Sequence, residues 1–233
     1  FPSVAAAEQA AYADFKAASH RNAQNFHITD DALGVGGAKA KFRANMAAIR
    51  LLQELEFEGL QASPEQQEIL SRYVGWGGLS EFFKEDNPHY TELKNVLSDE
   101  EYASARESTL TAFYTPPVVI KAVYSALENM HFQTGNVLEP SCGIGNFMGL
   151  VPESMNDAKF YGVELDNISG RIAQQLYQKN SIAVQGFENT NLPDSFFDAA
   201  IGNVPFGQFK VPDKRYDKHN FLIHDYFFGA TRS

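Results

Sequence analysis

The sequence predicts an α/β fold in which a mainly parallel sheet follows an all-helical region. After residue 110, short apolar runs alternate with helical patterns, which is typical of βαβ units. Before that point, apolar residues recur at spacings of three and four, and capping residues mark helix starts. We therefore expect residues 1–110 to be a helical N-terminal extension and residues 111–233 to be the sheet domain.

Four helices are expected in the first part. Residues 4–18 are a weak candidate, whereas residues 39–58 carry a clear apolar stripe. Ser63 and Ser98 each begin a capping box, so a helix should follow each of them. Trp76, the single tryptophan, is expected to fill the core between two helices rather than to stack on a ligand.

The second part contains four apolar runs of strand length, separated by helical patterns. The expected strands are residues 137–139, 160–166, 182–186 and 196–201. The expected helices are residues 118–130, 168–177 and 219–230. Right-handed crossovers bring the carboxyl ends of parallel strands to one edge, where ligands bind. A fourth strand with no further neighbour is an unpaired edge, so we expect later strands beyond Ser233 or pairing from another chain.

Composition limits the class of protein. With 44% hydrophobic residues among 233, the chain can bury a sizeable core. Cys142 is the one cysteine, which excludes an internal disulfide and favours a reducing compartment, the cytoplasm. No apolar run reaches the ~18 residues of a membrane span, so no membrane partner is expected. Because Phe1 is not an initiator methionine, we expect the chain to be a piece of a longer protein.

The formal net charge of −10 argues against a general nucleic-acid coat protein, but it is compatible with an enzyme that has a local basic rim. Two basic clusters exist, and most clusters of this size are solvated faces. The first comprises Lys39, Lys41, Arg43 and Arg50. The second comprises Lys210, Lys214, Arg215, Lys218 and His219, and it directly follows the loop described next.

The segment Asn203-Val204-Pro205-Phe206-Gly207 follows the last expected strand. Pro205 has no amide proton for a strand ladder, and the flanking glycines free the backbone, so a stiff loop should form at the strand's carboxyl end. The amide oxygen of Asn203 and the next carbonyl could accept both protons of an exocyclic amine, while Phe206 could stack on a base. The alternative is an ordinary strand-to-loop turn, where asparagine, proline and glycine are common.

Three other segments follow the ends of the earlier strands. Gly143-x-Gly145 lets the backbone approach a ligand, although it also suits a tight strand–helix turn. Glu164 stands where dinucleotide folds place the acid that takes two ribose hydroxyls, although it could be a solvent-facing acid. Phe187 and Glu188 could hold an adenine ring. Together and in this order, the segments predict a nucleoside-containing ligand.

The ligand is better predicted as S-adenosylmethionine than as a nicotinamide cofactor. The dinucleotide fingerprint needs a third glycine, and position 148 is methionine. Glu139, just before the turn, would repel a pyrophosphate but would pair with an ammonium group. The ligand should therefore carry an amino-acid part as well as a nucleoside.

Four motifs occur in order in the second part. They are Phe113-Tyr114-Thr115-Pro116, Glu139-Pro140-Ser141-Cys142-Gly143-Ile144-Gly145-Asn146-Phe147, Gly162-Val163-Glu164-Leu165-Asp166 and Asn203-Val204-Pro205-Phe206. With them, residues 111–233 resemble class I S-adenosylmethionine-dependent methyltransferases of the adenine-N6 DNA type, in the subclass whose cofactor motif precedes the catalytic motif. Two segments of the first part are Lys39-Ala40-Lys41-Phe42-Arg43-Ala44-Asn45 and Tyr73-Val74-Gly75-Trp76-Gly77-Gly78-Leu79. With them, residues 34–110 resemble the stretch before the methylase in large methylase–helicase proteins of phages and conjugative elements. The resemblance implies a Rossmann-like class I methyltransferase sheet, incomplete in this chain.

The resemblance also implies roles for the cofactor-binding residues. Thr115 and Glu139 would contact the methionine end, Glu164 would take the ribose hydroxyls, and Phe187 with Glu188 would take the adenine. The full expected set is Tyr114, Thr115, Glu139, Pro140, Gly143, Gly145, Glu164, Phe187, Glu188 and Asn203. No metal ion is expected.

Asn203, Val204, Pro205 and Phe206 would form the catalytic loop, with the target amine held by the Asn203 side chain and the Val204 carbonyl. Valine stands where the family usually has a first proline, so the carbonyl is kept but rigidity is reduced. The DNA, flipped out of a duplex or single-stranded, would have its flanking phosphates held by the basic residues of the second cluster. They are Lys210, Lys214, Arg215 and Lys218.

Two other functions fit the sequence. A protein methyltransferase acting on a glutamine amide could use the same loop, since it suits any planar amine. A non-catalytic cofactor-binding or DNA-binding module of a larger antirestriction or helicase protein would need no methyl transfer.

Overall fold

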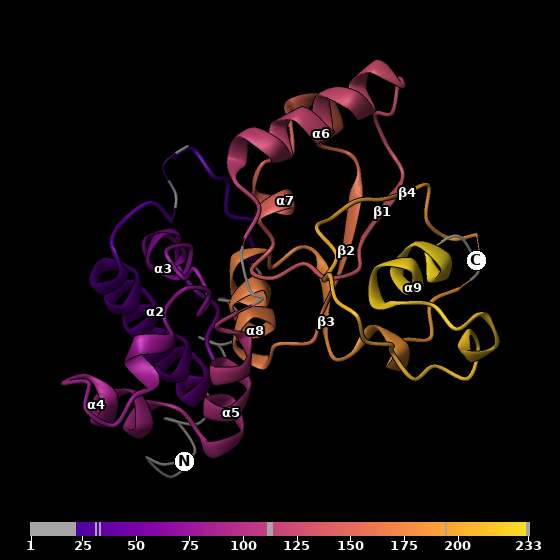
Figure 1. The fold of residues 1–233 in the computed structure, drawn as a ribbon. Coiled ribbons are helices and arrows are strands. Elements are labelled where there is room, and N and C mark those ends of the chain that lie inside the picture. Colours follow the sequence, from indigo (N-terminus) through magenta and orange to yellow (C-terminus); the bar gives the residue numbers. More distant parts are fainter. Residues whose placement is uncertain (1–21, 31, 33, 111–113, 194, 232–233) are drawn as a thin grey trace, which may run out of the picture.

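The structure is a computed structural model that describes residues 22–30, 32, 34–110, 114–193 and 195–231. The helix expected over residues 4–18 and Phe113 of the first motif lie outside the described residues. A helical region lies on one side of a parallel sheet, and the last helix lies on the other side (Figure 1).

The helical region is built as the capping residues predict. Its elements are α2 Ala38–Glu58, α3 Pro64–Leu70, the 3-10 turn η1 Ser80–Phe83, α4 Tyr90–Val96 and α5 Asp99–Ser108. Both capping boxes form: Ser63 Oγ accepts from the Gln66 amide at 3.3 Å, and Ser98 Oγ accepts from the Glu101 amide at 3.1 Å. Trp76 is 1% exposed and packs edge-on against Phe83, which confirms its place in the core.

The described residues form one parallel sheet of four strands. The strands are β1 Asn136–Glu139, β2 Lys159–Glu164, β3 Ser181–Val184 and β4 Ala199–Ala200, in the order β3-β2-β1-β4. This is the order in which a doubly wound Rossmann sheet begins. The predicted Rossmann-like α/β sheet after a helical region is therefore confirmed.

The last strand is shorter than the sequence predicts. Residues 196–201 were expected, but β4 comprises only Ala199–Ala200. The ladder still extends by one hydrogen bond at each end, from the Asp198 amide to the Asn136 carbonyl and from the Ile201 amide to the Leu138 carbonyl. Phe196 and Phe197 instead turn their rings edge-on to Tyr161 on β2.

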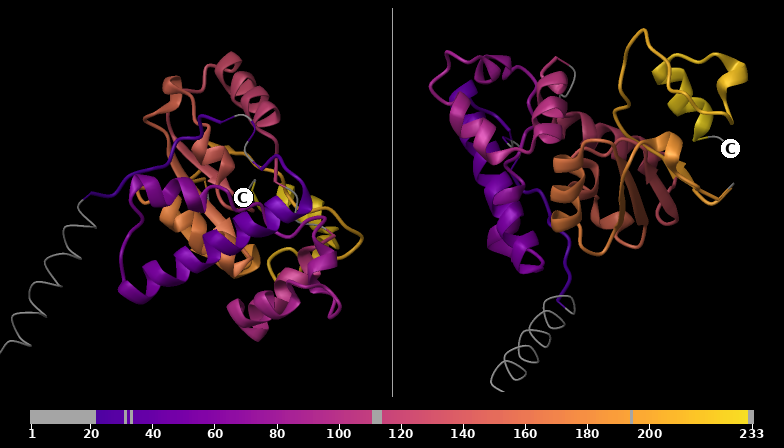
Figure 2. Two further views of the ribbon diagram at one scale, coloured as in Figure 1. Left: turned by 90° about the vertical axis from the view of Figure 1, so that its left-hand side faces the viewer. Right: turned by 90° about the horizontal axis from the view of Figure 1, so that it is seen from below.

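Neighbouring residues of a strand face different cores, as the period of two requires. Val137 belongs to a large cluster that joins this face of the sheet to the helical region, α6 Pro117–Asn129, α7 Asn146–Gly149 and α8 Asn167–Leu176. Leu138 belongs to a smaller cluster with α9 Ile223–Ala230. The sheet is thus covered on both faces, and Figure 2 shows the helical region and the C-terminal segment on opposite sides of it.

The C-terminal helix begins later than the predicted residue 219. A 3-10 turn, η4 Asp217–His219, is followed by Asn220 with a φ of 57°. A left-handed residue cannot continue a right-handed helix, so α9 starts only at Ile223. The glycine turn likewise opens a shorter helix than usual, since α7 ends at Gly149.

Candidate functional site

The ends of three neighbouring strands bring the predicted site residues to one edge of the sheet. Glu139 ends β1, Glu164 ends β2, and Asn203 follows β4, which pairs with β1. Two contacts tie these segments together: the Gly143 amide donates to Glu164 Oε2 at 2.7 Å, and Ser141 Oγ donates to the Asn203 carbonyl at 3.2 Å. The glycine turn, the acid and the Asn203 loop therefore share this edge.

The glycine turn has a backbone that only glycine fits. Gly143 and Gly145 have φ angles of 57° and 85°. A Cβ atom on Gly143 would come within 2.7 Å of the Tyr114 ring, and one on Gly145 would come within 2.4 Å of the Tyr177 ring. The backbone of the turn thus packs directly against two tyrosine rings, with Gly143 half-buried and Gly145 buried.

Glu139 is a buried acid at the end of β1. The side chain is 2% exposed, and its Oε2 atom accepts no hydrogen bond among the described residues. Burial raises the pKa of Glu139 well above its usual range, and the nearby Glu164 raises it further. A carboxyl group in this state is ready to take a cation, because a positive charge beside it would restore its ionised form.

Glu164 is held by the backbone around it. Its two oxygens accept from the Gly143 and Asp166 amides, each at 2.7 Å. Burial raises the pKa of Glu164 to about 7, although both hydrogen bonds oppose the shift. Each carboxylate oxygen has a second lone pair, so two hydroxyl groups could still donate to this side chain.

The first motif closes the glycine turn from the side of the helical region. The Tyr114 hydroxyl lies 2.9 Å from Ser169 Oγ on α8, and its ring lies against Gly143. Thr115 lines a cavity of about 260 Å³, to which Asn146 of the turn also contributes. Pro140 is buried beside the backbone of the loop that carries Asn203.

Phe187 and Glu188 lie in the short turn η3 Phe187–Asn189, which follows β3. The Phe187 ring is 6% exposed and packs against Phe227 of α9 with ring centroids 5.3 Å apart. This burial leaves little of the ring for a ligand, which differs from the expected apolar platform. Glu188 is half-buried and accepts a hydrogen bond from the Asn189 side chain.

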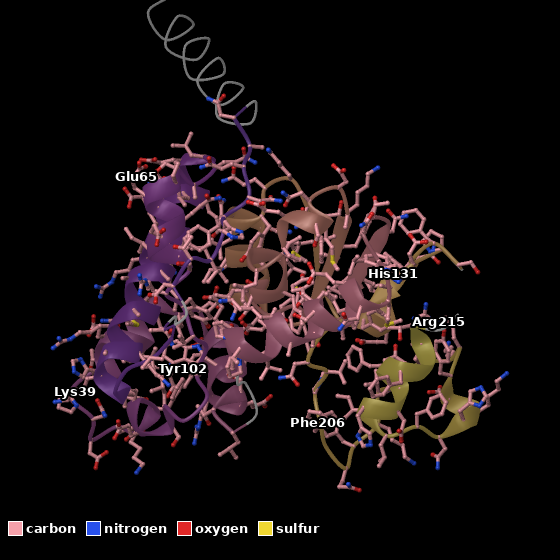
Figure 3. The ribbon with its side chains drawn as sticks, turned by 90° about the horizontal axis from the view of Figure 1, so that it is seen from above. Lys39, Glu65, Tyr102, His131, Phe206 and Arg215 are labelled. Atoms are coloured by element: carbon pink, nitrogen blue, oxygen red, sulfur yellow. The ribbon has the colours of Figure 1, made fainter. Side chains whose placement is uncertain are left out.

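The Asn203 loop is open to solvent. Asn203 and Pro205 are exposed, Val204 is half-buried against the smaller core cluster, and no hydrogen bond among the described residues engages the Asn203 amide. Phe206 is 71% exposed, with its ring centroid 6.3 Å from that of His224 (Figure 3). The aromatic ring and the amide are therefore both available to a substrate.

Arg215 forms a cross-link within the C-terminal segment. Its guanidinium pairs with buried Asp213 at 2.7 Å and donates to the carbonyls of Glu188 and Thr190, each at 3.0 Å. This pairing lowers the pKa of Asp213 to about 2. The segment after the Asn203 loop is thereby fastened to the turn after β3, a role for Arg215 that the charge pattern alone did not predict.

The other basic residues differ in their surroundings. Lys210 donates to the Asn220 side chain, whereas Lys214 and Lys218 are exposed. Sequence reasoning also missed Asp213 and Ser141. The two-residue spacing of Asp213 and Arg215 is a common turn signal, but nothing in the sequence places Ser141 against Asn203.

Other kinds of site are not seen in the described part of the chain. There, no three histidine, cysteine or acidic side chains converge in a way that could hold a metal ion. No helix among the same residues has both the length and the apolar character needed to cross a membrane.

The strand order defines a Rossmann-like α/β fold. The sequence of the chain is also similar to those of several known proteins. No protein-family profile matches the chain. Defense against restriction protein B of Escherichia phage P1 is 30% identical over 166 residues, which is 70% of this chain and 6% of that protein.

Two viral methylases are similar over about half of the chain. Type II methyltransferase M.CvrRI of Paramecium bursaria Chlorella virus XZ-6E is 31% identical over 49% of this chain and 29% of its own length. Modification methylase CviBIII of Paramecium bursaria Chlorella virus NC1A is 27% identical over 50% of this chain and 30% of its own length. The chain thus spans less than a third of each of these relatives.

A crystal structure of a candidate class I S-adenosylmethionine-dependent methyltransferase from Listeria monocytogenes shows a more distant likeness. The TM-score is 0.41 at 19% identity, over 91% of this chain and 62% of that one. The fold assignment rests on the strand order and not on this likeness.

Proposed function

We propose that the chain transfers a methyl group from S-adenosylmethionine to the exocyclic amine of adenine in DNA. The observation that carries the proposal is the shared edge, where the Ser141 hydroxyl joins the exposed Asn203 loop to the glycine turn at 3.2 Å. A transferred carbon must pass between two groups held side by side, and this edge supplies both. The similarity to two viral methylases supports the same reaction class.

The residues of the glycine turn fit this cofactor. The unpartnered oxygen of Glu139 suits the ammonium group, and glycine at 143 and 145 keeps side chains out of a turn that would lie beside the amino-acid part. Glu164 would accept from the ribose hydroxyls. The cofactor supplies an electrophilic methyl carbon on its sulfonium.

The Asn203 loop would hold the target. An adenine amine is a poor nucleophile because its lone pair is delocalised into the ring. Acceptance of its two protons by the Asn203 side chain and the Val204 carbonyl favours a pyramidal nitrogen whose lone pair faces the methyl carbon. The bound cofactor would supply its methyl carbon to this nitrogen and would leave as a neutral thioether, while one amine proton would pass to water. Alignment of the reacting groups can contribute roughly 7–11 kcal/mol to lowering the barrier.

The base must leave its stack to reach this edge. Flipping costs a few kcal/mol, least for single-stranded DNA. Phe206, with its exposed ring, could return ~1–3 kcal/mol by stacking on the flipped base. Lys214 and Lys218 follow this loop in the chain, and both are exposed to solvent. They would bind the phosphates on either side of the flipped base.

The test is transfer of labelled methyl from S-adenosylmethionine to DNA. We expect the label in the DNA as N6-methyladenine, with transfer by the Asn203→Ala variant about 10²–10³-fold slower. Label found on protein glutamine would instead support the protein methyltransferase alternative, and cofactor binding without transfer to either substrate would support a non-catalytic module.

A second candidate is a role in protection from restriction, favoured by the 166-residue similarity to the phage P1 protein. Methylation could be the means of protection, or the chain could act without transfer. Protection of DNA in cells that express the Asn203→Ala variant distinguishes the two: it is lost if methylation protects and kept if binding alone does.

A further inference from the structure

A cavity of about 260 Å³ lies where the helical region meets the glycine turn. Lys41 of α2 and Val74 form part of its wall from the helical region, and Thr115, Ile144 and Asn146 form part of it from the sheet region. Ile144 belongs to the glycine turn and Asn146 begins α7 directly after it, so the cavity adjoins the proposed cofactor site. Its volume is below the ~300 Å³ at which whole-ligand pockets begin, so it suits one end of a larger ligand.

Two polar groups in this wall lack a partner among the residues that the structure describes, the Lys41 ammonium and one oxygen of Asn146. Lys41 is half-buried and makes no hydrogen bond or ion pair with the described residues. Asn146 Oδ1 is buried and accepts no hydrogen bond there either. A cation and a hydrogen-bond acceptor facing a partly apolar cavity match a zwitterionic amino-acid end with an apolar chain.

The charge around the edge explains why a cation from outside the sheet is needed. Glu139 and Glu164 suit the ammonium and ribose groups of S-adenosylmethionine, but both acids would repel its carboxylate. Lys41 is the cation that lines the adjoining cavity. A carboxylate pointing into the cavity would lie away from the two acids and toward this ammonium group.

We propose that the helical region completes the cofactor site: Lys41 binds the carboxylate of the amino-acid end, and Asn146 shares the ammonium with Glu139. This inference rests on the proposed function, because it takes S-adenosylmethionine as the ligand. It gives the helical region a part in cofactor binding that the glycine turn and the acids do not supply.

The experiment measures binding by calorimetry for the wild type, Lys41→Met, Lys41→Arg and Lys39→Met. Lys39 is the matched control, because it lies two residues away on α2, is exposed, and points outward from the molecule (Figure 3). Each protein is titrated with S-adenosylmethionine and with 5′-methylthioadenosine, which lacks the amino-acid end.

We expect Lys41→Met to weaken S-adenosylmethionine binding by about 10- to 100-fold, the range for loss of a hydrogen bond to a charged group. The affinity for 5′-methylthioadenosine should stay at the wild-type value. Lys41→Arg should recover most of the loss, and Lys39→Met should bind both ligands as the wild type does.

Three results would overturn the inference, and they differ in what they leave standing. If Lys41→Met binds S-adenosylmethionine as tightly as the wild type, Lys41 is not part of the cofactor site, and the proposed function still stands. The same conclusion holds if Lys41→Met loses affinity for DNA alone. Equal losses for both ligands would show a structural role. A wild type that binds no S-adenosylmethionine would end both proposals.

Discussion

The two halves of the ligand edge differ in how much of the protein supports them. Around the glycine turn, Glu139 is 2% exposed, Gly145 lies against Tyr177, and both oxygens of Glu164 are held by backbone amides. Around the Asn203 loop, Phe206 is 71% exposed and Phe209 is 54% exposed. In one half the side chains are fixed by packing and hydrogen bonds, and the other half is a surface loop joined to it through Ser141.

The difference suggests separate roles for the two halves, one in binding the cofactor and the other in binding the target. A site whose groups are already fixed binds with little loss of conformational entropy, whereas an open loop must be ordered by what it binds. We therefore expect cofactor binding to depend on the packing of the glycine turn and target binding to order the loop. Changes in the two halves should have separable effects.

The largest expected effect comes from Asn203→Ala. Loss of the amide removes one of the two acceptors for the target amine, so methyl transfer should fall by about 10²–10³-fold, as for other groups that act in the transition state. Cofactor affinity should stay at the wild-type value, because Ser141 contacts the Asn203 carbonyl and not its side chain. Single-turnover transfer and calorimetry measure the two quantities.

Gln208→Ala is the control for Asn203→Ala, since Gln208 is an exposed amide in the same segment. It should transfer methyl groups at the wild-type rate. Transfer by Asn203→Ala at a near wild-type rate would remove this residue from the chemistry.

The next effect compares two glycines, one from each half. An alanine at Gly145 combines a left-handed backbone with a Cβ 2.4 Å from the Tyr177 ring, so the free energy of unfolding should fall by about 2–4 kcal/mol. For an alanine at Gly207 the three nearest atoms all belong to the exposed Phe209 ring, which can turn away, so the change should stay within about 0.5 kcal/mol. Urea unfolding of both variants gives the comparison, and equal losses would contradict it.

The sequence predicted the surroundings of the glycine turn better than those of the Asn203 loop. Spacing and residue type were enough to place Gly143, Gly145 and Glu164 together, because short crossovers in a parallel sheet fix where strand ends meet. They were also enough for the capping boxes at Ser63 and Ser98, which are local interactions.

What the sequence could not give depends on long-range packing. Burial of Phe187 follows from where α9 packs, and the cross-link of Arg215 to the turn after β3 joins residues 25 and 27 positions apart. The left-handed Asn220 that delays α9 has no unique sequence signal, since asparagine also occurs inside helices. The contacts of Lys41 with the cavity likewise need the packed structure.

A smaller effect is expected from pH on cofactor affinity. Free Glu164 has a pKa of about 7, and hydroxyl groups that donate to its ionised form would lower that value on binding. Binding then releases a proton, so affinity should rise with pH below about 7, by up to tenfold per unit for one proton, and should level off above that value. The pKa of Glu139, raised by burial, changes affinity in the same direction when an ammonium binds.

Calorimetry at several pH values, in buffers with different ionisation heats, measures this proton release. Glu164→Gln keeps an acceptor for one backbone amide but cannot titrate, so the part of the pH dependence near 7 should disappear. An affinity that is flat between about pH 6 and pH 8 in the wild type would show that neither acid titrates on binding.

The smallest expected effect concerns the open half and its basic residues. Lys214 is exposed, so Lys214→Gln should remove one phosphate contact. The plot of log DNA affinity against log salt should then be less steep by about 1. Arg215→Ala should change that slope little, because its guanidinium is engaged by Asp213 and two carbonyls, and should instead reduce stability. Filter binding across a salt series and thermal unfolding measure the two.

Lys179→Gln is the charge-matched control, because Lys179 lies just before β3 and therefore at the opposite edge of the sheet. It removes the same charge from the protein, so a general electrostatic effect would change the salt slope equally for Lys179→Gln and Lys214→Gln. A change confined to Lys214 would place the phosphate track beside the Asn203 loop. If Arg215→Ala instead makes the salt dependence of DNA affinity less steep and leaves stability unchanged, the expected roles of Lys214 and Arg215 are wrong. The guanidinium would then bind a DNA phosphate rather than hold the turn after β3.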